Sequence, residues 1–176
     1  MIAKKSPLIF QSFLLLKLEY NLTPKPPVLK NRQNEVDLLN EYPIDINFFI
    51  RKGKKDENLI YLKIGINKST NSLPGYMLFA EGVGIFEFEK SAEFDENQKS
   101  TLLHYSGLSI CINSIRGILS NTTSNSPMEK YTLPSIDVNE LLKEKELMQQ
   151  KNSSDSKPRI GVKKTKTIKP KQLSNK

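Results

Sequence analysis

Residues 76–88 read YMLFAEGVGIFEF, and the two glycines at the centre decide between two kinds of protein. Gly82 and Gly84 could open a phosphate-binding loop, which would indicate an enzyme or a nucleotide switch. A dinucleotide loop needs a third glycine where this chain has Glu87, with a helix starting there, and no Gly-Lys-Ser/Thr follows either. The β-branched and aromatic residues around the glycines instead favour a strand over residues 76–89.

Both faces of this strand carry apolar side chains in its central part. Because glycine has no side chain, one face of the strand has a depression at these positions. We expect another element to approach closely there, or the strand to bulge. Because neither face is polar, we expect a cover on each side of the sheet. Helices would form one cover, and a second subunit is the candidate for the other.

Alternating apolar residues predict three further strands, over about residues 10–22, 42–51 and 60–67. In the first of these, the alternation places Leu14 and Leu18 on the same face. A charged hairpin loop joins the second strand to the third, and polar segments form the other connections. The sequence therefore predicts a sheet of four strands.

After Asp95 the apolar period changes from two to about three and a half, which predicts a long helix. Asp95, Asn97 and Ser100 are the candidate N-caps, and the polar run 121–127 ends the helix. Its apolar stripe consists of Leu108, Cys111, Ile112, Ile115, Ile118 and Leu119.

An extended segment over residues 131–136 leads to a last helix, from Val138 to about Lys151. Asp137 is its expected N-cap, with Glu140 at the capping-box position. The expected architecture is α+β: a four-stranded antiparallel sheet in meander order, followed by two α-helices packed on one side.

The positive charge of the chain is concentrated at the C-terminal end. From Lys151 onward the sequence has nine Lys and Arg residues against Asp155 alone, whereas residues 1–150 have 18 basic and 18 acidic residues. We therefore expect one folded domain over 1–150 and a disordered basic tail over 151–176. The tail fits phosphates, an acidic partner or anionic lipid, but it has no aromatic residue for base stacking.

The residues needed for catalysis and metal binding are scarce. One cysteine, Cys111, excludes an intramolecular disulfide, and one histidine, His104, leaves little material for a zinc site. The two lie seven residues apart, about two helical turns, so a packed cysteine is the favoured interpretation. We expect no enzyme activity, no metal and no cofactor.

The N-terminal 20 residues imitate a signal peptide, but Gln11 and Ser12 interrupt the apolar run and no cleavage site follows. The run is also too short to cross a membrane. We expect a cytoplasmic protein without a transmembrane segment.

From Phe10 to Leu147, the order of elements resembles the SecB family of protein-export chaperones. The resemblance is carried by the strand YMLFAEGVGIFEF, the helix LLHYSGLSICINSIRGILSNTT, the segment YTLPSID and the helix VNELLKEKEL. Three local features carry the resemblance within these segments. As in the family, the strand has a pair of small residues before an Ile-Phe step, here within Gly82–Phe86. The long helix has an arginine, here Arg116, and a Leu-Pro segment, here Leu133-Pro134, precedes the last helix.

This resemblance implies a dimer of dimers that holds unfolded polypeptides in apolar grooves without ATP. The client-binding residues that it implies are Ile44, Ile46, Phe48, Leu133, Val138, Leu141 and Leu142. The subunit-interface residues that it implies are Phe79, Val83, Ile85 and Arg116. For each groove residue, the alternative is that it fills the core of the monomer.

Two departures separate the chain from the export members of the family. Ile112-Asn113-Ser114 stands where the family has an aromatic-proline-tyrosine run. Export members use an acidic surface to bind the ATPase SecA, whereas this chain has a neutral body and a basic tail. Docking to SecA is therefore not expected. A SecB-like chaperone with another client, such as the antitoxin of a toxin–antitoxin system, fits the sequence equally well. The alternative function is binding to nucleic acid or the ribosome through the 157–176 tail.

Overall fold

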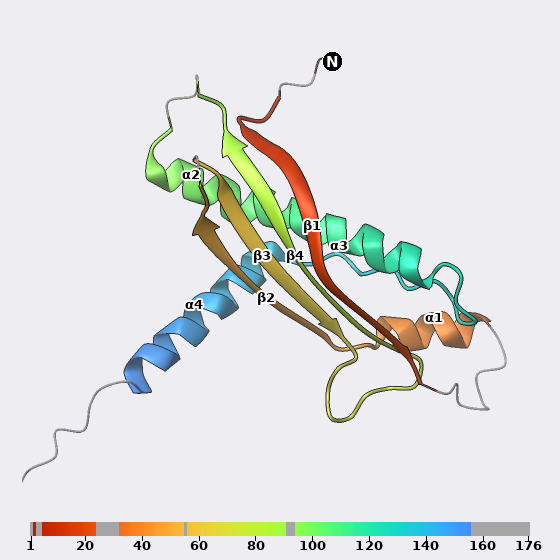
Figure 1. The fold of residues 1–176 in the computed structure, drawn as a ribbon. Helices are drawn as coiled ribbons and strands as arrows, with labels where there is room; N and C mark the ends of the chain where they lie inside the picture. The colour runs from red at the N-terminus through yellow and green to blue at the C-terminus, as the bar shows by residue number, and fades with distance from the viewer. Residues whose placement is uncertain (1, 3–4, 24–31, 55, 91–93, 156–176) are drawn as a thin grey trace, which may run out of the picture. The chain divides into compact units, whose positions relative to one another are not determined.

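The computed structural model describes residues 2, 5–23, 32–54, 56–90 and 94–155. The chain forms two compact units, Met1–Leu142 and Lys143–Lys176, and the first contains the sheet and its core. All strands are antiparallel, in the order β1-β4-β3-β2 (Figure 1). The strands are β1 (Leu8–Leu22), β2 (Ile44–Lys52), β3 (Asn58–Ile66) and β4 (Tyr76–Phe88).

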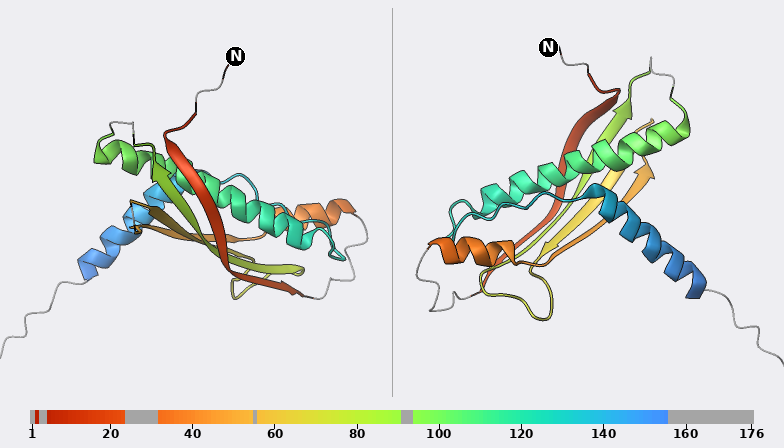
Figure 2. Two further views of the ribbon diagram at one scale, coloured as in Figure 1. Left: turned by 45° about the horizontal axis from the view of Figure 1, so that its top comes forward. Right: turned by 180° about the vertical axis from the view of Figure 1, so that it is seen from behind.

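The long helical stretch of the first unit lies on one face of this sheet, and the expected α+β class is confirmed. A continuous helical stretch crosses that face and is visible in the right-hand view of Figure 2. Asp95 caps its start, accepting a hydrogen bond from the backbone N of Gln98 at 2.7 Å. The stretch consists of α2 (Glu96–Leu102), a π-helical turn η1 (Leu103–Gly107) and α3 (Leu108–Thr123). The last helix, α4 (Val138–Asp155), begins in the first unit and continues into the second.

Two expectations about the connections are wrong. Residues 32–40 form a helix, α1 (Arg32–Asn40), where the sequence predicted only a polar connection. The meander order is also wrong, because β1 pairs with β4 and not with β2. The connection that contains α1 carries the chain from one edge of the sheet to the other, so β1 and β2 both become edge strands.

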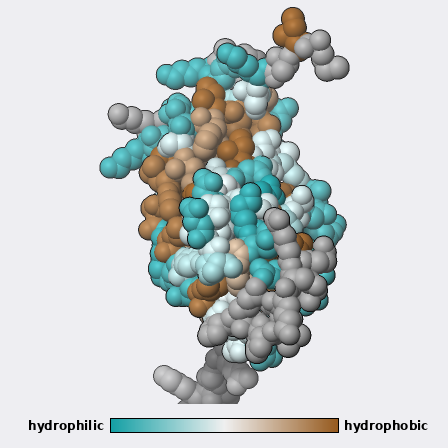
Figure 3. All heavy atoms as spheres, turned by 90° about the vertical axis from the view of Figure 1, so that its right-hand side faces the viewer, coloured by the Kyte–Doolittle hydropathy of each residue, from teal (hydrophilic) through white to brown (hydrophobic). Residues whose placement is uncertain are grey.

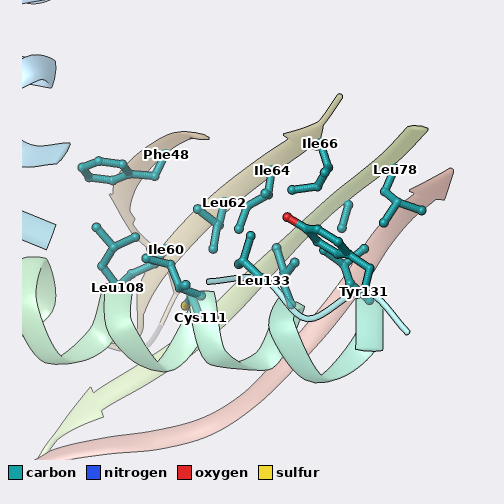
Figure 4. Packing of buried hydrophobic residues seen from close by; sticks show 14 of the residues in the cluster. Phe48, Ile60, Leu62, Ile64, Ile66, Leu78, Leu108, Cys111, Tyr131 and Leu133 are labelled. Carbon is teal, nitrogen blue, oxygen red and sulfur yellow. The ribbon is translucent and has the colours of Figure 1, made fainter. Parts of the chain in front are cut away.

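The core fills the layer between the sheet and α3. The even-numbered residues of β3 from Ile60 to Ile66 are fully buried there, and Figure 4 shows Ile60 beside Leu108 and Cys111 of α3. Burying a side chain of this size contributes about 1.5–3 kcal/mol. The fully buried β3 residues are Ile60, Leu62, Ile64 and Ile66.

Neighbouring side chains approach both glycines of β4 closely, as expected. A Cβ on Gly82 would collide with the ring of Phe13 from β1 and would lie 2.9 Å from the carbonyl oxygen of Leu14. A Cβ on Gly84 would collide with Sγ of Cys111 and would lie 2.7 Å from the ring of Phe86. Strand β4 is therefore a structural element with no phosphate loop.

Strand β1 departs from simple alternation at two points. Its register with β4 shifts between Phe10 and Ser12 and again between Leu15 and Lys17. Each shift exchanges the faces of the residues that follow. The prediction that Leu14 shares a face with Leu18 is therefore wrong: Leu14 lies opposite Val83 on the outer face, while Leu18 lies opposite the buried Ala80.

Candidate functional site

The first wall of the candidate site is the even-numbered face of β2. These residues pair with the buried residues of β3, so their side chains lie on the helix-covered face of the sheet. Ile44, Ile46 and Ile50 are half-buried, whereas Phe48 is only 4% exposed and meets the His104 ring edge-on at 6.5 Å. Three of the four side chains therefore keep apolar surface at the edge of the sheet.

The second wall is the extended segment 128–137 together with the first turn of α4. Leu133 is 1% exposed and belongs to the core (Figure 4). Val138, Leu141 and Leu142 are half-buried and pack against that core. Asp137 caps the helix by accepting a hydrogen bond from the backbone N of Asn139 at 2.8 Å. We call the half-buried residues Ile44, Ile46, Ile50, Val138, Leu141 and Leu142 the apolar strip.

The extended segment is held by side chains from other elements. Arg116 of α3 donates from Nε to the carbonyl oxygen of Leu133 at 2.8 Å and from Nη2 to that of Pro134 at 2.9 Å. The Thr123 hydroxyl oxygen accepts from the backbone N of Tyr131 at 3.0 Å. Tyr76 of β4 donates to the carbonyl oxygen of Glu129 at 2.9 Å. These bonds fix the second wall relative to the helix and the sheet.

The four residues predicted at a subunit interface do not lie together. Arg116 lies on the helix side of the sheet and donates a hydrogen bond to Leu133 of its own chain. The helical pattern of the sequence gives no sign of this contact. Phe79, Val83 and Ile85 lie on the outer face of β4, where Val83 is buried and the other two are half-buried.

The outer face has an apolar half and a charged half. One cross-strand row is formed by Phe49, Tyr61, Val83 and Leu14, and the rings of Phe49 and Tyr61 stack at 4.6 Å. The charged half is formed by the ion pairs Lys17–Glu19 at 2.6 Å, Lys68–Glu19 at 2.5 Å and Lys63–Glu81 at 3.2 Å. Hydrogen bonds from Lys17 and then Lys68 lower the pKa of Glu19 to about 2.

Strand β1 exposes more large apolar side chains than any other described element, which the sequence did not predict. Figure 3 shows apolar side chains gathered in one broad region of the surface. Leu16, at the second register shift, is 54% exposed. The β1 strip, which faces the helix side, consists of Phe10, Leu15, Leu18, Tyr20 and Leu22, all 37–42% exposed.

A cavity of about 800 Å³ lies where Ile50 and the hairpin meet α2 and η1. Its lining mixes Ile50, Phe88 and Leu103 with charged residues, and Lys52 and Lys99 pair there with Glu96 at 3.6 and 3.3 Å. Within the described ranges, no group of three or more His, Cys, Asp and Glu residues could hold a metal ion.

His104 and Cys111 do not form a nucleophile pair. Nδ1 of His104 contacts the carbonyl oxygen of Ser100 at 2.8 Å, while Cys111 is buried against Gly84. Burial raises the pKa of the Cys111 thiol to about 12, so it is protonated at neutral pH.

Comparisons with known proteins match the fold and not the sequence. No family model matches the chain, and no curated protein has a similar sequence. A solved structure that matches is the SecB-like chaperone Rv1957 of Mycobacterium tuberculosis, in complex with a ChAD peptide from the Rv1956 HigA1 antitoxin. The match covers 74% of this chain and 88% of that chain, with a TM-score of 0.52 and 10% identity.

The chain has a SecB-like fold. This confirms the architecture that the sequence resemblance implied. A protein of unknown function from Streptococcus agalactiae also aligns, with a TM-score of 0.36 and 9% identity over 73% of this chain and 97% of that chain. Among the helices of the described residues, none is long and apolar enough to cross a lipid bilayer.

Proposed function

We propose that this SecB-like chain is an ATP-independent holdase that binds non-native polypeptides through the apolar strip. The observation that carries the proposal is the half-buried apolar surface on β2 and the first turn of α4, within a fold shared with a peptide-bound chaperone. Apolar burial is non-directional, so such a surface accepts many client sequences. Phe48 and Leu133 are buried, so in this proposal they support the apolar strip from the core side.

Self-association belongs to the same proposal. The β1 strip exposes a row of large apolar side chains on a sheet edge, and patches of this kind mark protein interfaces. We propose that this strip joins two copies and that two such dimers form a tetramer. The outer-face residues Phe79, Val83 and Ile85 remain candidates for a second contact.

The client is proposed to be an antitoxin or another nascent chain, not a protein delivered to SecA. Glu19 and Glu81 on the outer face are paired with lysines. Carboxylates neutralised in this way offer a partner little acidic surface. We place the protein in the cytoplasm, where a free thiol such as that of Cys111 is the normal state of a cysteine.

Native mass spectrometry tests the proposal with reduced, carboxymethylated α-lactalbumin as the unfolded client. We expect an oligomer that binds this client in the absence of nucleotide and does not bind disulfide-intact α-lactalbumin, which is the folded control. A stable monomer that binds neither form would contradict the proposal.

A second candidate function rests on the excess of eight positive charges from Lys151 onward. Binding to RNA or DNA through this tail would weaken steeply as salt rises. Truncation after Gln150 would then abolish nucleic-acid binding and leave client binding intact. Absence of binding to full-length chain at low salt would exclude this candidate.

A further inference from the structure

The outer face of the sheet carries a partly exposed apolar band that crosses all four strands. Its two ends, Leu14 on β1 and Phe49 on β2, are each 49% exposed. Contiguous apolar surface of this kind marks a protein interface. The apolar band consists of Leu14, Val83, Tyr61 and Phe49 in one cross-strand row and of Ile85 and Leu59 in the next.

A row of charged residues with alternating signs lies beside the apolar band. It runs from Lys17 on β1 to Glu81 on β4 and Lys63 on β3. Nζ of Lys63 and Oε1 of Glu81 are 3.2 Å apart, and their strands are the central pair of the sheet. Opposite charges therefore stand on either side of the midline of the sheet, which runs between β3 and β4.

This arrangement is complementary to itself under a two-fold rotation. We consider a second copy placed face to face, with the axis parallel to the strands along the midline. Each row then meets the same row of the second copy, and β4 meets β3. Glu81 faces Lys63 of the second copy, and Leu14 faces Phe49 of the second copy. Charge thus meets opposite charge, and apolar surface meets apolar surface.

The other axis within the plane of the contact does not give this match. A two-fold axis perpendicular to the strands keeps each strand opposite itself and reverses the order of the rows. It places Val83 and Tyr61 opposite Glu81 and Lys63 of the second copy. Charges would then be covered by apolar side chains, which costs free energy. The pattern of the outer face therefore favours one orientation.

We propose that the outer face of the sheet binds the outer face of a second copy, with the strands of the two sheets aligned. This inference rests on the self-association in the proposed function and adds the surface and the geometry of the second contact. Sheets packed in this way lie about 10 Å apart, with strands within about 30° of each other. The apolar band forms the centre of the contact and the charged row its polar rim.

The outer-face contact leaves the apolar strip, on the opposite face of the sheet, free for a client. Its axis runs along the midline, whereas the β1 strip lies at the edge of the sheet. Because the axes of the two contacts do not meet, the contacts together do not close into a ring. We therefore expect assemblies that grow beyond the tetramer as the protein concentration rises.

Two charge reversals test the contact. Glu81→Lys and Lys63→Glu each place like charges opposite one another, twice in every pair of copies. We expect each variant alone to weaken outer-face association at least roughly tenfold, measured by sedimentation velocity over a range of concentrations. An equal mixture of the two variants should restore it to within roughly threefold of the parent, because opposite charges again face each other.

The mixture separates a contact between copies from the ion pair within each copy. Every chain in the mixture still has like charges at positions 63 and 81, so an effect on the fold of the single chain would persist. Exposed ion pairs contribute little to stability, so both variants should unfold at the Tm of the parent. If the mixture of folded variants failed to associate, the proposal would be overturned.

A pair of apolar variants on β1 gives a second readout. Leu14→Ser removes one end of the apolar band, and we expect it to weaken outer-face association roughly threefold to tenfold. Ile9→Ser is the matched control, since Ile9 is 41% exposed on the same face but pairs with Glu87, outside the band. Equal effects of the two variants would contradict the proposal.

The outcomes separate this inference from the proposed function. The same distribution of masses for the parent, the two charge variants and their mixture would overturn the outer-face contact and leave the β1 contact and the holdase standing. A parent that stays monomeric at every concentration would overturn both contacts. Carboxymethylated α-lactalbumin tests the other occupant: if a saturating amount separated the outer faces, the client would bind there and the proposal would be overturned.

Discussion

Arg116 in α3 donates from Nε to the carbonyl oxygen of Leu133 at 2.8 Å, and this bond fixes the extended segment against the helix. The same guanidinium reaches the carbonyl oxygen of Pro134 at 2.9 Å and the side-chain oxygen of Asn113. A planar group with several donors suits this double contact, which a lysine ammonium cannot reproduce with the same geometry. Within the second wall, the Leu133–Pro134 step is therefore held by the Arg116 side chain.

The first prediction concerns that side chain. We expect Arg116→Ala to lower the free energy of unfolding by about 1–3 kcal/mol, because it leaves two carbonyl groups without a charged donor. Arg116→Lys should recover only part of this loss, and Asn113→Ala should cost less, since it removes only one partner of the guanidinium. Urea unfolding measures all three variants. If the Arg116→Ala protein were as stable as the parent, the hydrogen bonds from Arg116 to Leu133 and Pro134 would not stabilise the fold.

The second prediction compares Gly84, which is packed closely, with Gly117, which has open space around it. We expect Gly84→Ala to destabilise the fold by about 1–3 kcal/mol, because the new Cβ meets Cys111 and Phe86. Gly117 of α3 is the control, since a Cβ there has open space around it. Gly117→Ala should stabilise the helix by about 0.5–1 kcal/mol.

Combining Gly84→Ala with Cys111→Ala tests the contact itself. Removal of Sγ makes room for the new methyl group, so the double variant should lose less stability than the two single variants together. Strict additivity in urea unfolding would show that the two residues do not meet.

The third prediction concerns the buried thiol. Because the pKa of Cys111 is raised from 9.0 to about 12, the folded chain keeps its proton over a range where the unfolded chain ionises. The stability of the fold should therefore fall as pH rises from about 9 to about 12. Near pH 8, a thiol reagent such as DTNB should label the folded chain at least roughly a hundredfold more slowly than the chain in urea. Rapid labelling of the folded chain would contradict the burial of Cys111.

The fourth prediction concerns Glu19, whose pKa is lowered from 4.5 to about 2 by Lys17 and Lys68. A lowered pKa contributes stability above pH 4.5, and this contribution disappears as pH falls toward 2. We expect Glu19→Gln to flatten the decrease of the urea midpoint between these pH values. Glu89→Gln, at an exposed carboxylate outside the ion-pair cluster, is the control and should leave the decrease unchanged.

The fifth prediction separates the two faces of β2. Ile46→Ser removes apolar surface from the strip, and we expect it to weaken client binding by roughly threefold to tenfold, corresponding to about 1 kcal/mol. Phe49→Ser lies on the outer face of the same strand and removes a larger apolar side chain, so it is a demanding control. Isothermal titration with the carboxymethylated client should show a loss for Ile46→Ser alone. A loss confined to Phe49→Ser would place the client on the outer face.

Local patterns in the sequence predicted much of the fold. The alternation around Gly82 and Gly84 identified β4, the apolar stripe identified α3, and Asp95 was among the candidate caps. These features are encoded by residues close together in the chain, where the periods of strands and helices differ clearly.

The features that the sequence missed depend on contacts between distant residues. Helix α1 has few apolar residues, and Glu35, in its first turn, accepts a hydrogen bond from the backbone N of Glu129. The bulges of β1 exist only against β4, so alternation alone placed Leu14 on the wrong face. The hydrogen bond between Arg116 and Leu133 joins residues 17 positions apart, and one of them lies in an irregular segment. No periodic pattern in the sequence predicts such a contact.

Light scattering during dilution of a chemically unfolded protein tests the central claim most directly. Urea-denatured citrate synthase is diluted into buffer without nucleotide, in the presence of an equimolar or greater amount of this chain. The account predicts that aggregation is suppressed in proportion to the chain added, and that Ile46→Ser is less effective than Phe49→Ser. Unchanged aggregation at a tenfold excess of the folded chain would contradict the holdase function.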